Sequence, residues 1–486
     1  MKKIRASQGS REQKQIAILF SQNCKTWCAG MELAIKHGAT DLVTLFNASG
    51  LCAPYFLSKR RKRHQKLLLD NNAINSPHRS RLMERIGFLQ IHFIIRKFIE
   101  GRRIKKFPRI ILGDYDITSI VHCKIAANRG SRFFLFHDVN FFTFYRYSAI
   151  AIKSLRFAKR VFAEKYELLY VYNGRDIIEA TFVLVAKSYD CKVVFVERGA
   201  LKASFQLFDV SPHYHPNWWK LIQNQSAVEI GKEELKAIDR FKDDKLKGID
   251  TYKRESWNQN YEEGDYSQWG NFALFLSSST TEFSPFDEYN YESGFTNNKF
   301  EAILFLARAL KKKNMNLVIR RHPNSVGYDW VDREESHWSK VRGEPNVFYI
   351  SPYDRISSYS LIRASQRVYV WKSSIGFESL LLKKPTFCLA SAKWAWEEDF
   401  QLKTFSQIEE SLDRPFDSDL ATKTIFSYAN FMSNSGDKSK LFEFFDEHKI
   451  GLLSGEIIPN LSFQYLRSGI EKKFYDYIVG KPKKKA

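Results

Sequence analysis

Three segments in the second half of the chain place hydroxyls, cations and a histidine directly after apolar runs typical of buried strands. These segments are Ser277-Ser278-Ser279 after residues 272–276, Arg321-His322-Pro323 after 317–320, and Lys372-Ser373-Ser374 after 368–371. Parallel strands end at one edge of an open sheet, and ligands bind beyond that edge. Because hydroxyls, cations and helix starts suit anions, the pattern predicts a phosphate-binding crevice.

Ser373 and Ser374 open a predicted helix over residues 375–382, where unpaired amides and the helix dipole favour phosphate. Gly376 would allow close backbone approach, and Glu378, about one turn into the helix, would reach ribose hydroxyls. The alternative is that Ser374 is only an N-cap and Glu378 a common first-turn acid. The coincidence with the other two strand ends favours the binding role.

His322 lies between a predicted strand and Pro323, so its ring is expected at the rim of the sheet beside Arg320 and Arg321. A histidine there can donate a hydrogen bond or a proton to a departing phosphate, although it could also be an ordinary surface residue. The nucleotide contacts expected from this edge are Ser277, Ser278, Arg321, His322, Ser373, Ser374 and Glu378.

Short apolar runs alternate with helix-length stretches along most of the chain, which is the pattern of parallel sheets with crossover helices. We therefore expect an α/β fold with two Rossmann-like domains facing a central cleft, and a basic helical insertion at 57–106 in the first. The predicted strands are 16–20, 42–46, 109–113, 132–136, 168–172 and 192–196, then 272–276, 317–320, 347–350, 368–371 and 386–389.

The chain divides by pattern into four segments. We predict a first domain at 1–238, an interdomain connection at 239–270, a second domain at 271–424, and C-terminal helices with a basic tail at 425–486. The connection is polar and Tyr-rich with little periodicity. The C-terminal helices are expected to pack across both domains.

The formal net charge of +22 calls for an anionic partner, unless it is only a solvated positive surface. Nucleic acid, anionic lipid headgroups and phosphorylated substrates all qualify. The basic residues concentrate at 59–63, 96–106 and 481–485. An apolar basic helix at Phe88–Ile99 is too short to span a bilayer and at most lies on a membrane surface.

Six cysteines, at positions 24, 28, 52, 123, 191 and 388, lack paired metal-ligand spacing. We expect them to be reduced thiols of a cytoplasmic protein, and we expect no metal site and no cofactor. The first residues run from Met1-Lys2-Lys3 into polar sequence, so no export signal is expected.

The strand-end motifs carry a family resemblance. The Ser-rich loop after residue 276, the His-Pro at 322–323 and the run WKSSIGFESLLLKKPT at 371–386 together resemble the bacterial capsule polysaccharide biosynthesis family, which includes Kdo transferases. A similar His-Pro and Ser-Ser arrangement occurs in bacterial sialyltransferases of the GT-B fold. The resemblance covers about residues 271–389. It implies a GT-B-like glycosyltransferase of surface polysaccharide (capsule or lipopolysaccharide) synthesis. Because a helix start, His322 and neighbouring cations can neutralise a departing phosphate, we expect the reaction to need no metal ion.

By that resemblance, the second domain binds a nucleotide-sugar donor. His322 would contact or protonate the phosphate, Ser373 and Ser374 would bind it, Glu378 would hold the ribose, and the loop 351–354 with Pro352 would border the base. The relatives use CMP-activated acidic sugars such as Kdo or sialic acid, so a CMP-sugar is favoured and a UDP- or GDP-hexose is the alternative. The resemblance also implies a glycan or glycolipid acceptor and a cytoplasmic location peripheral to the anionic inner membrane.

The first domain would supply the acceptor side and the general base. An inverting transfer needs one carboxylate to remove the proton of the acceptor hydroxyl. Glu197, after a predicted strand, is the first choice and Asp138 the second. Asn173, Arg175 and Arg198 are expected to bind the acceptor or sugar. The alternative is that Glu197 and Arg198 form a structural ion pair beside a turn glycine.

The sequence allows three other interpretations. Asp114-Tyr115-Asp116 matches the metal-binding Asp-x-Asp motif of the other large glycosyltransferase fold, but we expect a turn and a helix N-cap for this pair. The charge and aromatic content would suit a non-enzymatic nucleic-acid-binding protein, but no nucleic-acid motif is present and we expect no nucleic-acid partner. A catalytically silent scaffold is disfavoured because the phosphate-site residues are retained.

Overall fold

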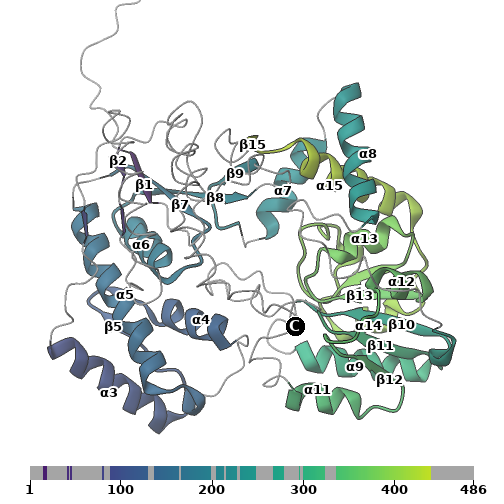
Figure 1. The fold of residues 1–486 in the computed structure, drawn as a ribbon, viewed down its shortest axis with the longest axis horizontal. Helices are drawn as coiled ribbons and strands as arrows, with labels where there is room; N and C mark the ends of the chain where they lie inside the picture. The colour runs from purple at the N-terminus through teal and green to yellow at the C-terminus, as the bar shows by residue number, and fades with distance from the viewer. Residues whose placement is uncertain are drawn as a thin grey trace, which may run out of the picture.

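Two open sheets, one in each half of the chain, organise the fold (Figure 1). The computed structural model describes the backbone of residues 15–18, 41–42, 44–45 and 79–80. It also describes residues 88–129, 136–163, 166–198, 204–212, 215–226, 230–247, 266–278, 295, 299–322 and 335–438. The predicted helix from Trp27, the basic run at 59–63, the loop from Ser279 and the tail at 481–485 lie outside these residues.

The first sheet has the strand order β15-β9-β8-β7-β1-β2. Strands β2, β1, β7 and β8 run parallel, whereas β9 pairs antiparallel with β8 and β15 pairs antiparallel with β9. The strands predicted at 16–20, 168–172 and 192–196 are confirmed. The strands of this sheet are β1 Gln15–Ile18, β2 Asp41–Leu42, β7 Leu168–Tyr172, β8 Lys192–Arg198, β9 Ser204–Phe208 and β15 Asp437–Lys438.

The strand predicted at 109–113 does not join this sheet. It forms β5 (Ile111–Leu112), which pairs antiparallel with β6 (Tyr115–Asp116) in a hairpin whose turn contains Gly113 at φ +60°. Ile110 is buried while Ile111 is 44% exposed, so this run anchors a surface hairpin rather than crossing a core. The run at 42–46 is also divided, because β3 (Thr44–Leu45) pairs with β4 (Arg79–Ser80) instead of continuing β2.

Of the strand predicted at 132–136, the structure describes only Phe136, and this residue is not in a strand. Residues Phe136–Asp138 form the short 3-10 helix η1, and residues 131–135 lie outside the described part. Phe136 packs edge-on against Phe107 and Phe144, with ring centroids 5.3 and 5.4 Å apart. This aromatic cluster belongs to the helical layer, so η1 is positioned by helices and not by the sheet.

Helices cover the first sheet and build a separate layer beside it. The long helix α5 contacts α3, α4 and α6, and Asn140 caps its start by accepting a hydrogen bond from the Thr143 amide at 2.7 Å. Helix α3 lies within the range of the predicted basic helical insertion, and the insertion itself stays a prediction. The bounds are α3 Phe88–Ile104, α4 Thr118–Arg129, α5 Phe141–Phe162 and α6 Ile177–Ser188.

The second sheet is fully parallel, in the order β12-β11-β10-β13-β14, and all five predicted strands are confirmed. All five residues of β10 are buried, as expected for a strand covered on both faces. Leu274 packs into the layer that contains α13, and Phe275 into the opposite layer with α9. The strands are β10 Phe272–Leu276, β11 Asn316–Arg320, β12 Val347–Ile350, β13 Arg367–Val370 and β14 Thr386–Cys388.

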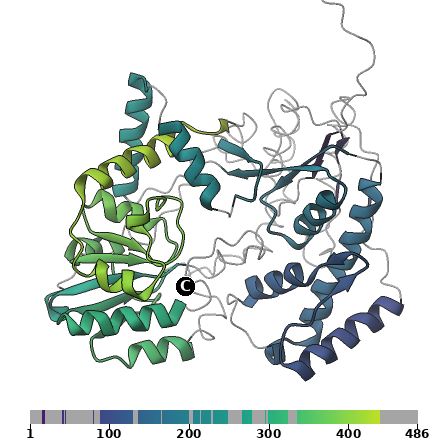
Figure 2. The same ribbon diagram turned by 180° about the vertical axis from the view of Figure 1, so that it is seen from behind.

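The helices of the second half form two layers, as the two views in Figures 1 and 2 show. Helices α11 and α14 contact α9 on one face, while α13 contacts α8 and α15 on the other. The bounds are η2 Ser267–Trp269, α9 Lys299–Lys312, α11 Glu335–Arg342, α12 Ser358–Ala364, α13 Ile375–Leu381, η6 Glu398–Phe400 and α14 Phe405–Ser411.

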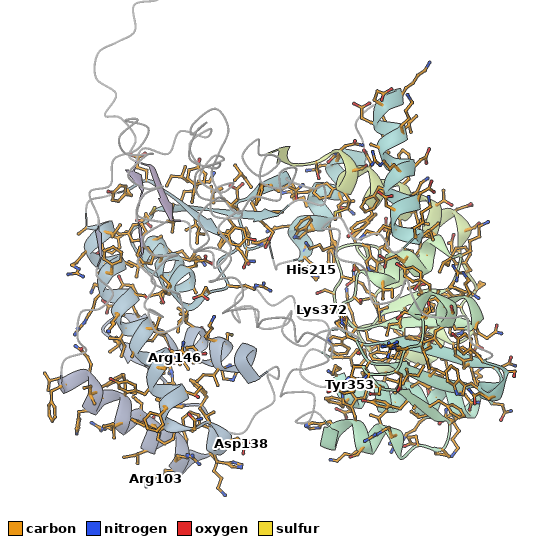
Figure 3. All side chains as sticks on the ribbon, in the orientation of Figure 1. Arg103, Asp138, Arg146, His215, Tyr353 and Lys372 are labelled. Atoms are coloured by element: carbon orange, nitrogen blue, oxygen red, sulfur yellow. The ribbon has the colours of Figure 1, made fainter. Side chains whose placement is uncertain are left out.

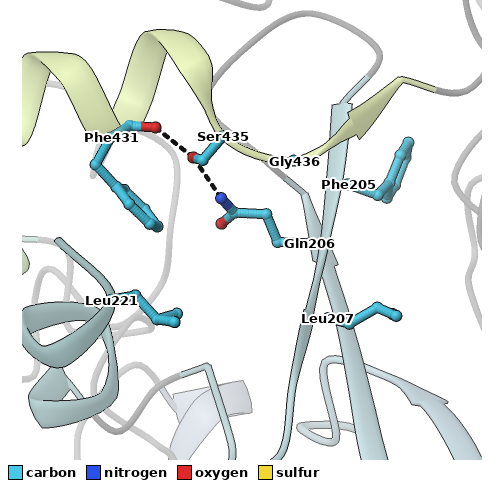
Figure 4. Close-up of a pocket in the computed structure, with 7 residues that line it drawn as sticks. All are labelled: Phe205, Gln206, Leu207, Leu221, Phe431, Ser435 and Gly436. Atoms are coloured by element: carbon cyan, nitrogen blue, oxygen red, sulfur yellow. Dashed lines mark hydrogen bonds between the residues drawn. The ribbon is translucent and has the colours of Figure 1, made fainter. Parts of the chain in front are cut away.

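The end of the described chain returns to the first sheet. Helix α15 (Ser418–Asn434) packs against α7 (His215–Ser226) and α8 (Lys232–Leu246), and β15 then extends the edge at β9. The Ser435 hydroxyl accepts a hydrogen bond from the Gln206 amide and donates one to the Phe431 carbonyl (Figure 4). These three residues line an open cavity of about 430 Å³.

The predicted packing of the C-terminal helices across both halves is thus seen for α15, and residues after 438 lie outside the described part. The boundary predicted after residue 238 falls inside α8, and the division of the chain into four segments stays a prediction. Among the described residues, no helix is long and apolar enough to cross a membrane. The described cysteines are buried thiols, and burial raises the pKa of Cys191 and of Cys388 to about 12.

Glu179, in the first turn of α6, is an acid buried to 2% exposure. Burial, together with the nearby Asp176 carboxylate, raises its pKa well above the ordinary value of 4.5. The folded protein therefore binds this proton more tightly than the unfolded chain does. The contribution of Glu179 to the free energy of unfolding falls as the pH rises from about 4.5 to the folded-state pKa.

We predict that Glu179→Gln removes this part of the pH dependence, because glutamine is neutral at every pH and has nearly the same shape. The urea midpoint of the variant should match the parent at low pH and exceed it as the pH rises. Glu233→Gln, at an exposed first-turn acid of α8, is the control and should leave the profile unchanged. Identical pH profiles for parent and Glu179→Gln would contradict the prediction.

Candidate active site

The strand order of the second sheet creates a switch point between β10 and β13. The chain proceeds from β10 outward through β11 and β12, and then returns to the other side of β10 with β13 and β14. Loops leave this point in opposite directions, which opens a crevice beyond the carboxyl ends of the strands. The three predicted strand-end segments follow β10, β11 and β13, so the structure brings them to the same edge.

Two serines after β10 join these segments. The Ser277 hydroxyl accepts a hydrogen bond from the His322 amide at 2.9 Å, and the Ser278 hydroxyl accepts one from the Lys372 amide at 3.1 Å. Both serines are buried. They fix the loops after β11 and β13 to the end of β10, a structural role that sequence reasoning did not foresee. Their predicted contact with a nucleotide stays a prediction.

The Ser373-Ser374 turn is held from behind by Trp394. The Trp394 indole is fully buried and donates a hydrogen bond to the Ser373 carbonyl at 3.0 Å. A Cβ on Gly376 would lie 2.1 Å from the same indole, so this packing requires a glycine at position 376, and the close approach of a phosphate stays a prediction. Ser374 is exposed, and its side chain makes no capping hydrogen bond. Ser374 thus occupies the N-cap position of α13 without capping it through its side chain, and its predicted binding role stays a prediction.

His322 lies at the sheet rim as predicted, and it is half-buried. Burial, with the Arg320 guanidinium nearby, lowers the pKa of His322 to about 4. The imidazole is therefore neutral near pH 7 in the unliganded protein. A neutral ring donates one hydrogen bond, and an anionic ligand beside it would favour the protonated form.

The two arginines before His322 have packing roles. The Arg320 guanidinium donates hydrogen bonds to the Ser351 carbonyl and, at 3.0 Å, to the Asp354 carbonyl. Arg321 is buried to 1% exposure, with its guanidinium 4.9 Å from the centre of the Trp338 indole and 3.0 Å from the Tyr349 hydroxyl oxygen. This placement explains Arg321 by packing, and its predicted nucleotide contact gains no support from the geometry.

The loop after β12 is held close to the same edge by Arg320. The Asp354 carboxylate accepts a hydrogen bond from the Ser351 amide at 2.7 Å, which closes a tight turn around the buried Pro352. Tyr353 projects from this turn with 62% exposure. Figure 3 shows Tyr353 and Lys372 on the side of the second half that faces the first half. The border of a base by Pro352 stays a prediction.

Glu378, on α13, faces into the protein. Its side chain is buried, with its carboxylate 3.8 Å from the Lys245 ammonium of α8. Burial and the Glu378 carboxylate raise the pKa values of Tyr359 and Tyr428. Glu378 therefore belongs to a buried polar cluster between α8, α12 and α15, and its predicted ribose contact stays untested.

Sequence reasoning missed a basic cluster between the two halves, formed by His215, Lys372 and Lys393. His215, the first residue of α7, lies 3.0 Å from the Ser391 hydroxyl through Nδ1. Burial, with Lys372 and Lys393 nearby, lowers the pKa of His215 well below its usual range. The dipeptide His215-Pro216 repeats the His-Pro pattern at 322–323, and this repetition was the available signal.

In the first half, Asn173 and Glu197 meet at the ends of neighbouring parallel strands. Asn173 adopts φ +60°, and its side-chain amide donates a hydrogen bond to the Glu197 carboxylate at 2.8 Å. The Asn173 side-chain oxygen accepts from the Arg175 amide at 3.2 Å. The turn thus orients Glu197, and the geometry gives it a partner other than Arg198. The Arg198 side chain lies outside the described residues.

Asp138 is positioned differently from Glu197. It lies on η1 with its side chain 46% exposed, 3.1 Å from His137, within the helical layer. Most of the strand that was predicted before it lies outside the described residues, so its predicted role stays a prediction. Asp116 occupies the expected helix-start position, because its carboxylate accepts from the Thr118 amide at 2.9 Å. Within the described part of the chain, histidine, cysteine and acidic residues form no cluster suited to a metal ion.

Comparison with known proteins adds a family match. Residues 288–421 match the family model described as "Capsule polysaccharide biosynthesis protein", so the expected family resemblance is confirmed over a region that includes β11 and β13. No curated protein matches the chain.

Several solved structures are similar to parts of the chain. Thermosulfurimonas dismutans KpsC, beta Kdo 2,4 transferase, is 14% identical, with 54% of this chain and 79% of that chain covered and a TM-score of 0.35. The KpsC beta Kdo 2,7 transferase of the same organism is 13% identical, with 57% and 89% covered and a TM-score of 0.33. The S. aureus MnaA-UDP co-structure is 12% identical, with 91% and 98% covered and a TM-score of 0.31.

We predict that His322 titrates near pH 4 in the unliganded protein and that saturating CMP raises its pKa, because a bound phosphate stabilises the imidazolium. NMR of protein labelled in the histidine rings measures both values, and His322→Gln identifies the signal. An ordinary pKa of about 6.5 without ligand would contradict the buried environment. A pKa that saturating CMP does not move would place His322 away from the phosphate.

Proposed function

We propose that this protein is an inverting, metal-independent glycosyltransferase that transfers an acidic sugar from a CMP-activated donor to a glycan or glycolipid acceptor in bacterial surface polysaccharide synthesis. The family match supports the role in polysaccharide synthesis. The observation that carries the proposal is the joining of three strand-end loops by the Ser277 and Ser278 hydroxyls at the switch point. A UDP- or GDP-hexose is the alternative donor.

The donor phosphate would lie beyond β13, between the Ser373-Ser374 turn and His322. Ser374 offers an exposed hydroxyl, and the Lys372 amide is fixed by Ser278. Because the surrounding loops are held before any ligand binds, little ordering is needed on binding, which favours affinity. The neutral His322 ring would donate a hydrogen bond to a phosphate oxygen.

The transfer breaks the bond between the anomeric carbon and the phosphate oxygen, and the bonding electrons leave with the nucleotide. The acceptor hydroxyl oxygen forms the new bond from the opposite face of the sugar, so the configuration inverts. Glu197 would take the hydroxyl proton, and His322 would stabilise the charge that develops on the phosphate. The Asn173 amide fixes one carboxylate oxygen of Glu197.

A cytoplasmic location at the anionic inner-membrane surface is part of the proposal. The net charge of +22 favours an anionic surface, and a membrane-bound acceptor would be available there. A nucleic-acid-binding protein would use the same charge, but it would leave the joined strand-end loops unexplained. Binding to nucleic acid that weakens steeply with salt, without nucleotide binding, would favour that alternative.

We predict that Ser373→Ala with Ser374→Ala weakens CMP binding at least roughly tenfold, because a hydrogen bond to a charged group contributes about 1.5–3 kcal/mol. The fold should persist, since Trp394 bonds the Ser373 backbone carbonyl, which alanine retains. Calorimetry with CMP, UMP and GMP measures affinity and donor base preference. Ser406→Ala with Ser418→Ala, at exposed helix-start serines, is the matched control. Unchanged CMP affinity in the folded site variant would remove this turn from the site.

We predict that Glu197→Gln lowers the transfer rate by roughly 10²–10⁴ while CMP affinity stays near that of the parent. Glutamine can still accept the Asn173 hydrogen bond but cannot take the acceptor proton. Transfer from CMP-Kdo is measured in EDTA, so activity that requires added magnesium or manganese would contradict metal independence. Asp138→Asn is the comparison variant. Loss of transfer in Asp138→Asn, with transfer retained in Glu197→Gln, would assign the base to Asp138.

A further inference from the structure

The outward face of α3 exposes large apolar side chains that the core does not cover. Phe88 and Leu89 are each 81% exposed, Ile99 is 60% exposed and Ile95 is 38% exposed. Phe88, Ile95 and Ile99 are seven and four residues apart, so they form one stripe along the helix. Single exposed apolar residues are ordinary on a protein surface, but four on one helix face mark an interaction surface.

The packing of α3 fixes this face outward. Ile94 and Gly101 are the buried positions of the helix and lie on a different side of it from the stripe. A Cβ on Gly101 would lie 2.3 Å from the Phe136 ring, so the helix backbone rests directly on that side chain. Phe98 adds ring contacts to Phe136 and Phe144 at 5.6 and 5.8 Å. Rotation of α3 that buried the stripe would break the contact between the Gly101 backbone and the Phe136 ring.

The charge of the same face is positive. Arg96 and Arg103 are exposed beside the apolar stripe, and the exposed Lys105 and Lys106 follow the helix. Glu100, the acid of α3, pairs with Lys97 at 2.8 Å. Apolar side chains flanked by cations match a lipid surface, where acyl chains lie beneath anionic headgroups.

The position of α3 leaves this face accessible to a large planar partner. Helix α3 lies at the outer edge of the first half, on the side away from the second half, in both views (Figures 1 and 2). Figure 3 shows Arg103 at the lower edge of the first half. A surface that meets α3 would therefore not obstruct the strand ends of the second sheet.

We propose that α3 is an interfacial helix that lies in the plane of an anionic membrane, with Phe88, Leu89, Ile95 and Ile99 inserted among the acyl chains. Arg96 and Arg103 contact the lipid phosphates. The inference deepens the proposed membrane location and rests on it only for the choice of surface, because it does not depend on the transfer reaction.

The test is co-sedimentation of the full chain with vesicles of phosphatidylcholine alone or mixed with phosphatidylglycerol. Phe88→Ser with Leu89→Ser should lower partitioning to the mixed vesicles at least roughly tenfold through lost apolar burial. Arg96→Gln with Arg103→Gln should lower it by roughly fivefold for each charge. In the Phe88→Trp variant, brominated lipids should quench fluorescence more than in the parent.

Matched controls separate insertion from charge and folding. Lys311→Gln with Lys340→Gln removes two exposed cations from the second half, and Leu235→Ser removes an exposed apolar side chain of α8, so both should bind vesicles like the parent. All α3 variants should keep the parent CMP affinity, which makes this test independent of the donor site. Undiminished vesicle binding in both α3 double variants, or no added quenching, would overturn the proposal and assign the face to a protein partner.

Discussion

The hydroxyls of Ser277 and Ser278 are the constraint on which the arrangement of the candidate donor site depends. Each hydroxyl accepts a hydrogen bond from a backbone amide of a different loop, so the carboxyl end of β10 fixes the loops after β11 and β13. An alanine at either position would leave a loop amide without this acceptor in a buried setting, at a cost of about 1–3 kcal/mol. The positions of His322 and the Ser373-Ser374 turn follow from these two bonds.

Burial beside cations keeps two histidines neutral in this structure. His322 is affected by burial and Arg320, and His215 by burial, Lys372 and Lys393. Because the surroundings of each histidine are already positive without a ligand, protonation of the imidazole is unfavourable there. A bound anion would change that balance, so ligand and proton binding at His322 are expected to be coupled.

Sequence reasoning predicted the second sheet well, because its strands are buried on both faces and give continuous apolar runs. It was less successful in the first half. The run at 109–113 resembles a strand locally, but only tertiary packing shows that it forms a surface hairpin. The antiparallel strand β9 lay inside a segment with no repeated pattern. For the candidate site, the sequence correctly predicted the rim position of His322, whereas the packing roles of Arg321 and Gly376 depend on Trp338 and Trp394, which only the folded chain brings against them.

The antiparallel pairing of β15 with β9 has a consequence for biosynthesis. The strand β15 at residues 437–438 follows the whole second sheet in the chain, yet it completes the edge of the first sheet. On the ribosome, β9 emerges more than two hundred residues before its partner. An uncovered strand edge can pair with other chains, so the nascent first half is expected to carry an aggregation-prone edge until β15 has been translated. Truncation before residue 437 would make that exposure permanent.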